Sequence, residues 1–168
     1  MTTPTVSVYL PTRNRCSLVV EAARSVLNQT FRDFELIIAD DASDDDTPQT
    51  LARLAESDSR IKVVRASTRL GPSAIRNLAI DAACGELITG LDDDDLMLPR
   101  RIDDLVRAAA HHESLICTGF YIERDGRRRM MNSTQRLITL NDLLHYNVVG
   151  NQALLRRRQF IALGGFDP

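Results

Sequence analysis

The feature that most constrains the fold of this chain is a fourfold alternation of short apolar segments with amphipathic ones. The apolar segments, which predict buried strands, span residues 6–10, 35–40, 61–65 and 86–91. Apolar residues at helical spacing follow each of them, in segments that begin near residues 17, 47, 71 and 99. Strands and helices that alternate through short connections favour an α/β fold with a doubly wound, mostly parallel sheet flanked by helices.

The expected helix ends carry their usual signals. Ser17 is a candidate N-cap, and Thr47 with Pro48 occupies the N-cap and first-turn positions of the next helix. Gly71-Pro72 opens the third predicted helix, and Gly85 is expected to close it.

The pattern changes to an α+β character after residue 113. Residues 114–122 predict a strand, Asp125-Gly126 a hairpin turn, 139–144 a short helix and 152–155 a further strand. A chain of 168 residues, 43% of them hydrophobic, buries one good core, so we expect a single domain.

Three polar loops follow predicted strands. The run 92–95 consists of four aspartates, the turn 40–46 is also acidic, and the loop 11–14 follows the first strand. The carboxyl ends of parallel strands meet at one edge of the sheet, where ligands bind. Four adjacent carboxylates repel one another unless a cation or hydrogen-bond donors compensate them. Oxygen ligands suit Mg²⁺ or Mn²⁺, although a solvated or helix-capping loop is the alternative.

Composition narrows the classes of partner. The net charge of -2 disfavours nucleic acid as a partner, although 127–129 and 156–158 are runs of arginine. These runs are interpreted as exposed surface or as contacts to anionic lipid headgroups or a phosphorylated acceptor. The three cysteines lie far apart, which disfavours a disulfide framework or zinc site and favours a reducing compartment. No signal peptide and no apolar run of about 20 residues is present, so we expect a soluble chain.

The order of motifs resembles the family 2 inverting glycosyltransferases, whose catalytic domain has the Rossmann-like GT-A fold. The segments that carry the resemblance are Val6–Arg15, Ser25–Phe31, Phe34–Ser43, Ala74–Asn77, Gly85–Ile88, Leu91–Asp95 and Gly164–Asp167. The resemblance implies transfer of a sugar, with inversion, from a nucleotide-diphosphate donor such as a UDP-sugar to an acceptor hydroxyl. It further implies a Mn²⁺ or Mg²⁺ cofactor, a glycan or lipid-linked acceptor, and a role in bacterial cell-envelope polysaccharide or lipopolysaccharide synthesis. The implied location is the cytoplasm, with peripheral association at the inner face of the membrane.

The resemblance also implies roles for individual residues. Asp41 accepts a hydrogen bond from the base, and Arg76 approaches the base or the diphosphate. Asp94 is the implied metal ligand, together with Asp92. The implied nucleotide-sugar-binding residues are Pro11, Thr12, Arg13, Asn14, Asp41, Arg76, Asp92 and Asp93.

Two departures from the family pattern matter. Arg13 stands where the family often has an aromatic residue that stacks on the base, a role that a guanidinium also fills. The general base of the family follows the Gly-Gly-Phe-Asp signature, whereas this sequence stops at Pro168. We therefore expect a domain cut short at its C-terminal end, with a nucleotide-sugar-binding half (1–112) and the start of an acceptor-binding half (113–168). Asp142 and Asp167 are candidate bases by residue type alone.

Alternatives to a transferase remain open. A nucleotide-sugar-binding module that lacks the general base has the same donor motifs. An aspartate-nucleophile phosphotransferase is disfavoured, because its acidic motif follows the first strand. Asp41, Ser43 and Asp45 are also interpreted as turn formers, and Arg76 as an exposed helix residue.

Overall fold

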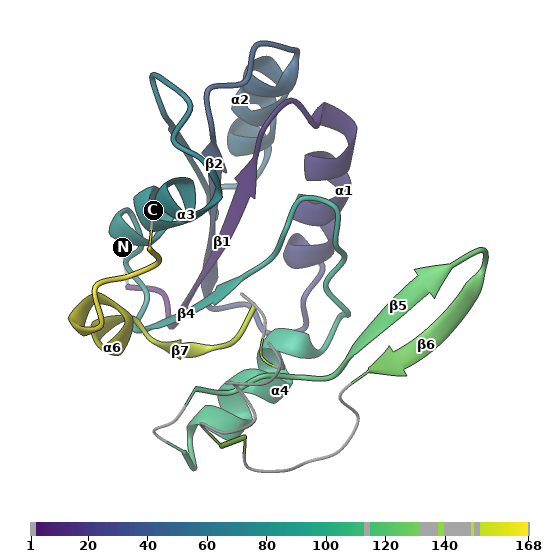
Figure 1. Ribbon diagram of the computed structural model, residues 1–168, viewed down its shortest axis with the longest axis vertical. Coiled ribbons are helices and arrows are strands. Elements are labelled where there is room, and N and C mark those ends of the chain that lie inside the picture. Colours follow the sequence, from purple (N-terminus) through teal and green to yellow (C-terminus); the bar gives the residue numbers. More distant parts are fainter. Residues whose placement is uncertain (1–2, 113–114, 132–137, 140–148, 150–151, 168) are drawn as a thin grey trace.

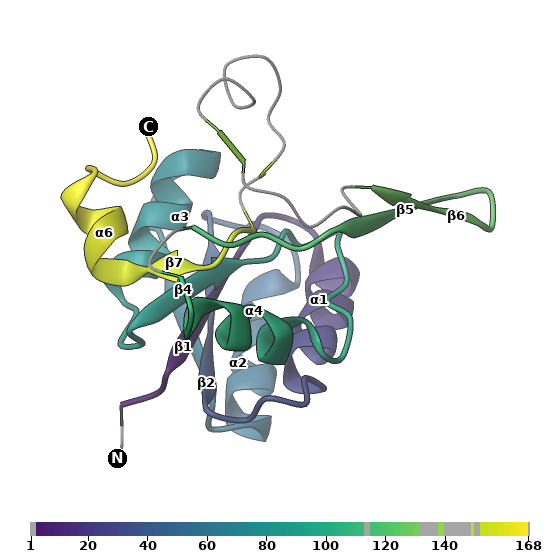
Figure 2. The same ribbon diagram turned by 90° about the horizontal axis from the view of Figure 1, so that it is seen from below.

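The computed structural model describes residues 3–112, 115–131, 138–139, 149 and 152–167, which form one main sheet with helices on both faces (Figures 1 and 2). The strands are β1 (Val6–Thr12), β2 (Phe34–Asp40), β3 (Ile61–Arg65), β4 (Leu87–Gly90), β5 (Phe120–Arg124), β6 (Arg127–Met131) and β7 (Leu155–Arg156). The helices are α1 (Cys16–Leu27), α2 (Thr47–Ser57), α3 (Pro72–Asp81), α4 (Arg101–Ala109) and α6 (Arg157–Ala162).

The main sheet has the strand order β3-β2-β1-β4-β7. The first four strands are parallel, and β7 pairs antiparallel with β4. The sequence-based prediction of a mostly parallel mixed sheet is therefore confirmed. Three of the loops that carry polar motifs leave the ends of β1, β2 and β4, which are adjacent in this order.

Alternate residues of the central strands bury against different helices. Val8 and Leu10 of β1 lie in a cluster with the apolar faces of α1, α2 and α4. Tyr9 faces the opposite side, where it packs with Ile75 and Ala79 of α3. Both faces of the sheet are thus covered, which explains why the strands read as continuous apolar runs.

The predicted helix ends were wrong by a few residues. Ser17 lies inside α1, whose N-cap is Arg15, and neither α1 nor α2 has a side-chain cap bond from its N-cap residue. Thr47 is the first residue of α2, and its N–H donates to Asp45 Oδ1 over 2.9 Å. The side chain of Asp45 thus provides an acceptor for a backbone N–H at the start of this helix. Hydrogen bonds from Thr47 lower the pKa of Asp45 below its usual value.

Gly85 was also misassigned, because α3 ends at Asp81 and not at the glycine. The residue instead lies against β1, where an added Cβ would be only 2.7 Å from the backbone nitrogen of Ser7. A close approach of two backbones, not a helix cap, accounts for glycine at this position.

The second part of the chain forms a hairpin and completes the sheet. Asp125 and Gly126 have φ values of 53° and 71°, as the predicted two-residue turn requires, and they join β5 to β6. The strand predicted over 114–122 was placed too early, since β5 begins only at Phe120 and runs to Arg124, and an isolated bridge joins Ile116 to Leu154 before it. The helix predicted over 139–144 falls almost wholly outside the described residues. Among the described residues, no helix is long and apolar enough to cross a bilayer.

Candidate functional site

A pocket of about 400 Å³ opens at the edge of the sheet where β1, β2 and β4 end. Its lining comprises four arginines, four aspartates and four other residues: Pro11, Thr12, Arg13, Arg15, Asp41, Arg69, Pro72, Ile75, Arg76, Asp92, Asp93 and Asp94. All the residues predicted for the donor site except Asn14 are among them. The expectation that the three polar loops converge is therefore confirmed.

A second depression, of about 690 Å³, lies along α1 and is larger. Its lining consists mainly of successive residues of that helix and includes only two acidic side chains, Glu21 and Asp45. We place the functional site in the smaller pocket, because charged groups from three loops meet there.

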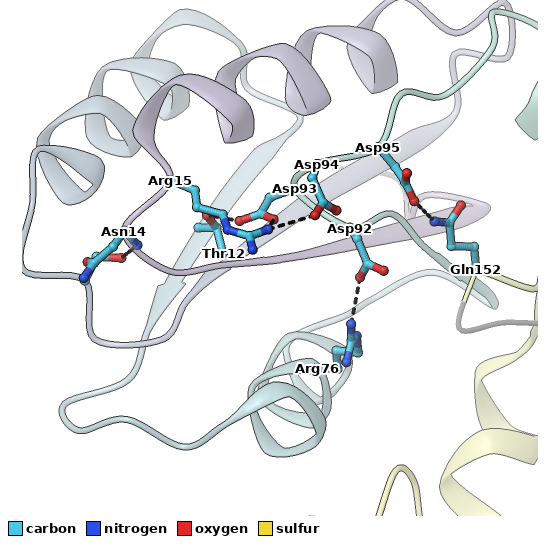
Figure 3. Close-up of polar contacts among 10 residues, drawn as sticks. Thr12, Asn14, Arg15, Arg76, Asp92, Asp93, Asp94, Asp95 and Gln152 are labelled. Atoms are coloured by element: carbon cyan, nitrogen blue, oxygen red, sulfur yellow. Dashed lines mark hydrogen bonds and ion pairs between the residues drawn. The ribbon is translucent and has the colours of Figure 1, made fainter. Parts of the chain in front are cut away.

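The four aspartates of the run 92–95 do not converge on one point: Asp93 and Asp94 share Arg15 as a partner, and the other two have partners of their own (Figure 3). Asp92 pairs with Arg76 over 2.7 Å, and Asp95 accepts a hydrogen bond of 2.5 Å from Gln152. Among the described residues, no three acidic, histidine or cysteine side chains are placed to hold one metal ion. Arginine side chains and other hydrogen-bond donors thus compensate the negative charges of these carboxylates in this structure.

Arg15 is the central cation of the acidic run. Its Nη1 lies 2.8 Å from Asp93 Oδ1 and 3.0 Å from Asp94 Oδ2 (Figure 3). The hydrogen bond to Asp93 is the main reason that the pKa of Arg15 is raised. Thr12, at the end of β1, donates a buried 2.7 Å hydrogen bond to the other oxygen of Asp93.

Asp94 is the aspartate best placed to hold a cation. Its side chain is 56% exposed, whereas that of Asp93 is 8% exposed and already accepts two hydrogen bonds. Mg²⁺ and Mn²⁺ are commonly held by one or two carboxylates, with phosphate oxygens completing the shell. The residues present fit that arrangement, and they do not fit a site built from protein ligands alone.

The loop after β1 and the loop after β2 are joined through Asn14. This residue has a φ of 52°, and its N–H donates to Ser43 Oγ over 2.9 Å. Its side-chain amide exchanges two hydrogen bonds with Asp44, of 2.5 and 2.9 Å. Asn14 therefore holds the two loops together and does not line the pocket, unlike Arg13.

Asp41 anchors the loop that precedes α3. It is 6% exposed, and its two carboxylate oxygens accept hydrogen bonds from the N–H groups of Leu70 and Gly71, over 2.6 and 3.1 Å. Ala42, the next residue, has a φ of 54°. These contacts bring Arg69 to the pocket wall. That Asp41 accepts a hydrogen bond from a nucleotide base stays a prediction.

Arg76 is a pocket residue and not an exposed helix residue. Its side chain is 17% exposed, and it bonds the carbonyl of Pro72 over 3.1 Å in addition to Asp92. The interpretation of Arg76 as an ordinary surface arginine was therefore wrong. Gly71, with a φ of 89°, and Pro72 at the start of α3 set the position of this helix.

Sequence reasoning missed a second layer of residues behind the acidic run. Arg101 of α4 reaches Thr89 Oγ1 over 3.5 Å and the carbonyl oxygen of Gln152, and burial lowers its pKa to about 10. Gln152 in turn holds Asp95, whose pKa is raised, chiefly by burial. Arg15 had a signal, since it directly follows the loop 11–14, and Arg69 lies two residues before the predicted helix start at Gly71. Gln152 had none, because its contact depends on how β7 returns to the sheet.

The Gly-Gly-Phe-Asp segment docks on α3. Asn77 Nδ2 donates to the carbonyl of Phe166 over 2.8 Å, and Phe166 N–H donates to Asn77 Oδ1 over 3.0 Å. Gly164 and Gly165 have φ values of 89° and 80°, which let the backbone turn toward Asn77. Of the two candidate bases, Asp167 lies outside the pocket lining and Asp142 lies outside the described residues.

The fold is the GT-A fold of glycosyltransferases, as two solved structures of that class show. The chain aligns over 97% of its length with S. aureus TarS 1-349 in complex with UDP-GlcNAc, at a TM-score of 0.80 and 24% identity, covering 48% of that chain. It aligns over 99% of its length with the mannosyltransferase PcManGT from Pyrobaculum calidifontis in complex with GDP-Man and Mn²⁺, at a TM-score of 0.76 and 24% identity, covering 48% of that chain.

The chain belongs to glycosyl transferase family 2, whose family model matches residues 7–165. It is 37% identical over 124 residues to the GalNAc(5)-diNAcBac-PP-undecaprenol beta-1,3-glucosyltransferase of Campylobacter jejuni, an alignment that covers 73% of this chain. The chain spans 40% of that relative's length.

Proposed function

We propose that this chain binds the nucleotide-diphosphate donor, a UDP-sugar, of a metal-dependent inverting glycosyltransferase. The observation that carries the proposal is the pocket at the ends of β1, β2 and β4, which is lined by four arginines together with the exposed Asp94. Arginines pair with phosphate oxygens, and a carboxylate can hold a cation that bridges to them. The pocket lining contains both kinds of side chain.

The pocket residues have different proposed roles in donor binding. Arg13, Arg69 and Arg76 place cationic groups around the pocket, and the planar guanidinium of Arg13 suits stacking on the base. Asp41 is the proposed acceptor for the base, and Asp92 and Asp93 are proposed to lie near the ribose. Asp94, with Asp92, would hold Mn²⁺ or Mg²⁺, which when bound neutralises charge on the leaving diphosphate.

The proposed acceptor is a glycan or lipid-linked hydroxyl in bacterial cell-envelope polysaccharide or lipopolysaccharide synthesis. Support comes from the Campylobacter jejuni relative, whose name specifies an undecaprenol-linked acceptor. We place the reaction in the cytoplasm at the inner face of the membrane. The second candidate function is donor binding without transfer, because no carboxylate in the described pocket is assigned as general base.

Calorimetric titration of UDP, with and without Mn²⁺, tests the donor site. We expect binding that depends on the metal and that Asp94→Ala reduces by at least about tenfold, the size expected for loss of a charged contact. The control is Asp46→Ala, an exposed aspartate that does not line the pocket.

Equal UDP affinity in the Asp94→Ala variant and the parent chain would contradict the metal assignment. If neither chain binds UDP while GDP binds, the base assignment is wrong and the donor site stands. Sugar transfer with retention at the anomeric carbon would contradict the proposed inversion.

A further inference from the structure

The β5–β6 hairpin stands clear of the main sheet and its helices (Figures 1 and 2). It forms a separate two-stranded sheet, and every residue of its strands is exposed except Met131, which is half-buried. Phe120 and Ile122 are 50% and 49% exposed. A lone two-stranded hairpin is marginally stable in water, so an arm that displays apolar side chains is suited to a surface that covers it.

The strand register separates the hairpin into two chemically different faces. Residues that pair across the strands share a face. One face, here called the arginine face, combines apolar and cationic residues: Phe120 opposite Met131, Ile122 opposite Arg129, and Arg124 opposite Arg127. The other face carries Tyr121 opposite Met130, and Glu123 opposite Arg128.

Charge is distributed unequally between these faces. Glu123 and Arg128 form a 2.7 Å ion pair on the second face and neutralise each other. The three arginines of the arginine face have no ion-pair partner among the described residues, and no acidic strand residue shares that face. This cationic face belongs to a chain with a net charge of -2.

The second run of arginines, 156–158, is used differently. Arg156 pairs with Glu86, and Arg157 Nε donates to the carbonyl oxygen of Ile80 over 3.4 Å, so two of its three side chains contact neighbouring elements of the fold. The three arginines of the arginine face have no such contact among the described residues. Their charge is available for a partner outside the chain.

We propose that the arginine face of the β5–β6 hairpin docks on an anionic phospholipid bilayer. Arginines bind lipid phosphates in bidentate fashion, while adjacent aromatic and aliphatic side chains enter the headgroup region. The hairpin lies flat in this arrangement, with Phe120 and Ile122 inserted beside the arginines. The inference does not rest on the proposed function, because no hairpin residue lines the donor pocket.

Vesicle flotation of the whole chain tests the proposal. One set of vesicles contains phosphatidylcholine alone, and the other contains phosphatidylcholine mixed with phosphatidylglycerol. The test variant carries Arg124→Gln, Arg127→Gln and Arg129→Gln, which remove charge and keep side-chain length. The matched control carries Arg24→Gln, Arg53→Gln and Arg158→Gln, three exposed arginines on helices, so both variants have the same net charge.

We expect the parent chain and the control to float with the phosphatidylglycerol vesicles and not with phosphatidylcholine alone. The hairpin variant should bind about a hundredfold more weakly, since each basic residue near an anionic surface contributes about fivefold. Ile122→Ser should weaken binding as well, because it removes the inserted side chain. Thermal unfolding followed by circular dichroism verifies that each variant retains the fold.

Three results would overturn the proposal. The parent chain fails to float with either vesicle, the control loses as much binding as the hairpin variant, or phosphatidylcholine alone binds equally well. A dimer in sedimentation velocity that Ile122→Ser dissolves, together with absent flotation, would assign the face to a second copy of this chain.

Discussion

At the scale of single residues, Arg15 neutralises part of the negative charge of the acidic run 92–95. One guanidinium nitrogen contacts both Asp93 and Asp94, so the carboxylate proposed to hold the metal already has a cationic partner. A metal ion and Arg15 therefore compete for the same oxygens. The side chain of Arg15 is 48% exposed, which limits the strength of its ion pairs.

The variant Arg15→Ala should bind Mn²⁺ more tightly in the absence of nucleotide. The gain is at most about fivefold, because an ion pair of an exposed side chain is worth up to about 1 kcal/mol. Free Mn²⁺ measured by electron paramagnetic resonance during a titration checks this. Arg24→Ala, which removes the same charge from the exposed side of α1, should leave Mn²⁺ affinity unchanged. Weaker Mn²⁺ binding by Arg15→Ala would show that Arg15 supports the metal site instead.

Asp58 supplies a pH-dependent part of the stability at the start of β3. Both its oxygens accept hydrogen bonds from the Arg60 guanidinium, over 3.0 and 2.7 Å, and these bonds lower the pKa of Asp58 below its usual 3.8. Arg60 also lies 4.7 Å from the centre of the Phe34 ring. The contribution of Asp58 is therefore present above pH 3.8 and is lost as the pH falls through the lower pKa of the folded chain.

We expect Asp58→Asn to lower the free energy of unfolding by about 1 kcal/mol at neutral pH, the size of a typical intramolecular hydrogen bond. The difference from the parent should shrink as the pH falls below the usual carboxyl pKa. Urea unfolding at a series of pH values measures it. Glu56→Gln, an exposed acidic residue of α2, is the control and should show no such trend.

At the scale of the elements, Gly85 determines how closely β4 approaches β1. Its N–H donates to Ser7 Oγ over 2.8 Å, and a Cβ at this position would lie 2.8 Å from the carbonyl carbon of Val6. Backbone atoms must move to admit even one methyl group. Gly85→Ala should therefore cost about 1–3 kcal/mol of unfolding free energy, as overpacked sites do.

Urea unfolding at neutral pH measures the effect of Gly85→Ala. The neighbouring variant Cys84→Ala is the control, since Cys84 is exposed, and it should change stability by less than about 0.5 kcal/mol. An unchanged midpoint for Gly85→Ala would mean that the entry to β4 adjusts freely. The donor pocket, which lies at the opposite ends of these strands, should retain its nucleotide affinity in either variant.

The elements before residue 110 were predictable because each has a local signal. Apolar runs such as 35–40 indicate the strands, and apolar residues at helical spacing indicate the helices. Only the predicted ends of these elements therefore differ from the observed ones. Ser17 and Thr47 were misplaced by one or more residues, because no side chain of an N-cap residue caps α1 or α2. β7 is two residues long, and its place beside β4 depends on long-range packing that no local pattern encodes.

The site was predictable to the level of which loops meet. Residues 11–13, 41, 76 and 92–94 all line the pocket, since the strand order of the fold places their loops together. Which partner each aspartate contacts was not predictable, because it depends on side-chain geometry in three dimensions. The contacts are Asp93 with Arg15, Asp92 with Arg76, and Asp95 with Gln152.

At the scale of the whole molecule, described residues beyond position 113 contribute to the core that the earlier strands and helices build. Leu154, 1% exposed, packs in the cluster that also contains residues of β1, α1 and α4. Its backbone exchanges two hydrogen bonds with Ile116, of 2.7 and 2.8 Å. The later segment thereby completes the sheet beside β4, and Gln152 from the same segment holds the acidic run.

Leu154→Ala should therefore destabilise the whole chain, not only its second part. A buried leucine truncated to alanine costs about 2–5 kcal/mol, and the loss should appear as a single shifted unfolding transition. Leu163→Ala is the control, because Leu163 is 82% exposed and should change stability by less than about 0.5 kcal/mol. Tyrosine fluorescence and far-ultraviolet circular dichroism during urea unfolding provide two probes of the same transition.

If Leu154→Ala split the transition in two, with an unshifted major step, the segment around β7 would be an appendage to an independently stable core. A single shifted transition instead ties the acidic run to the return strand, so that the donor pocket and the later segment form and unfold together.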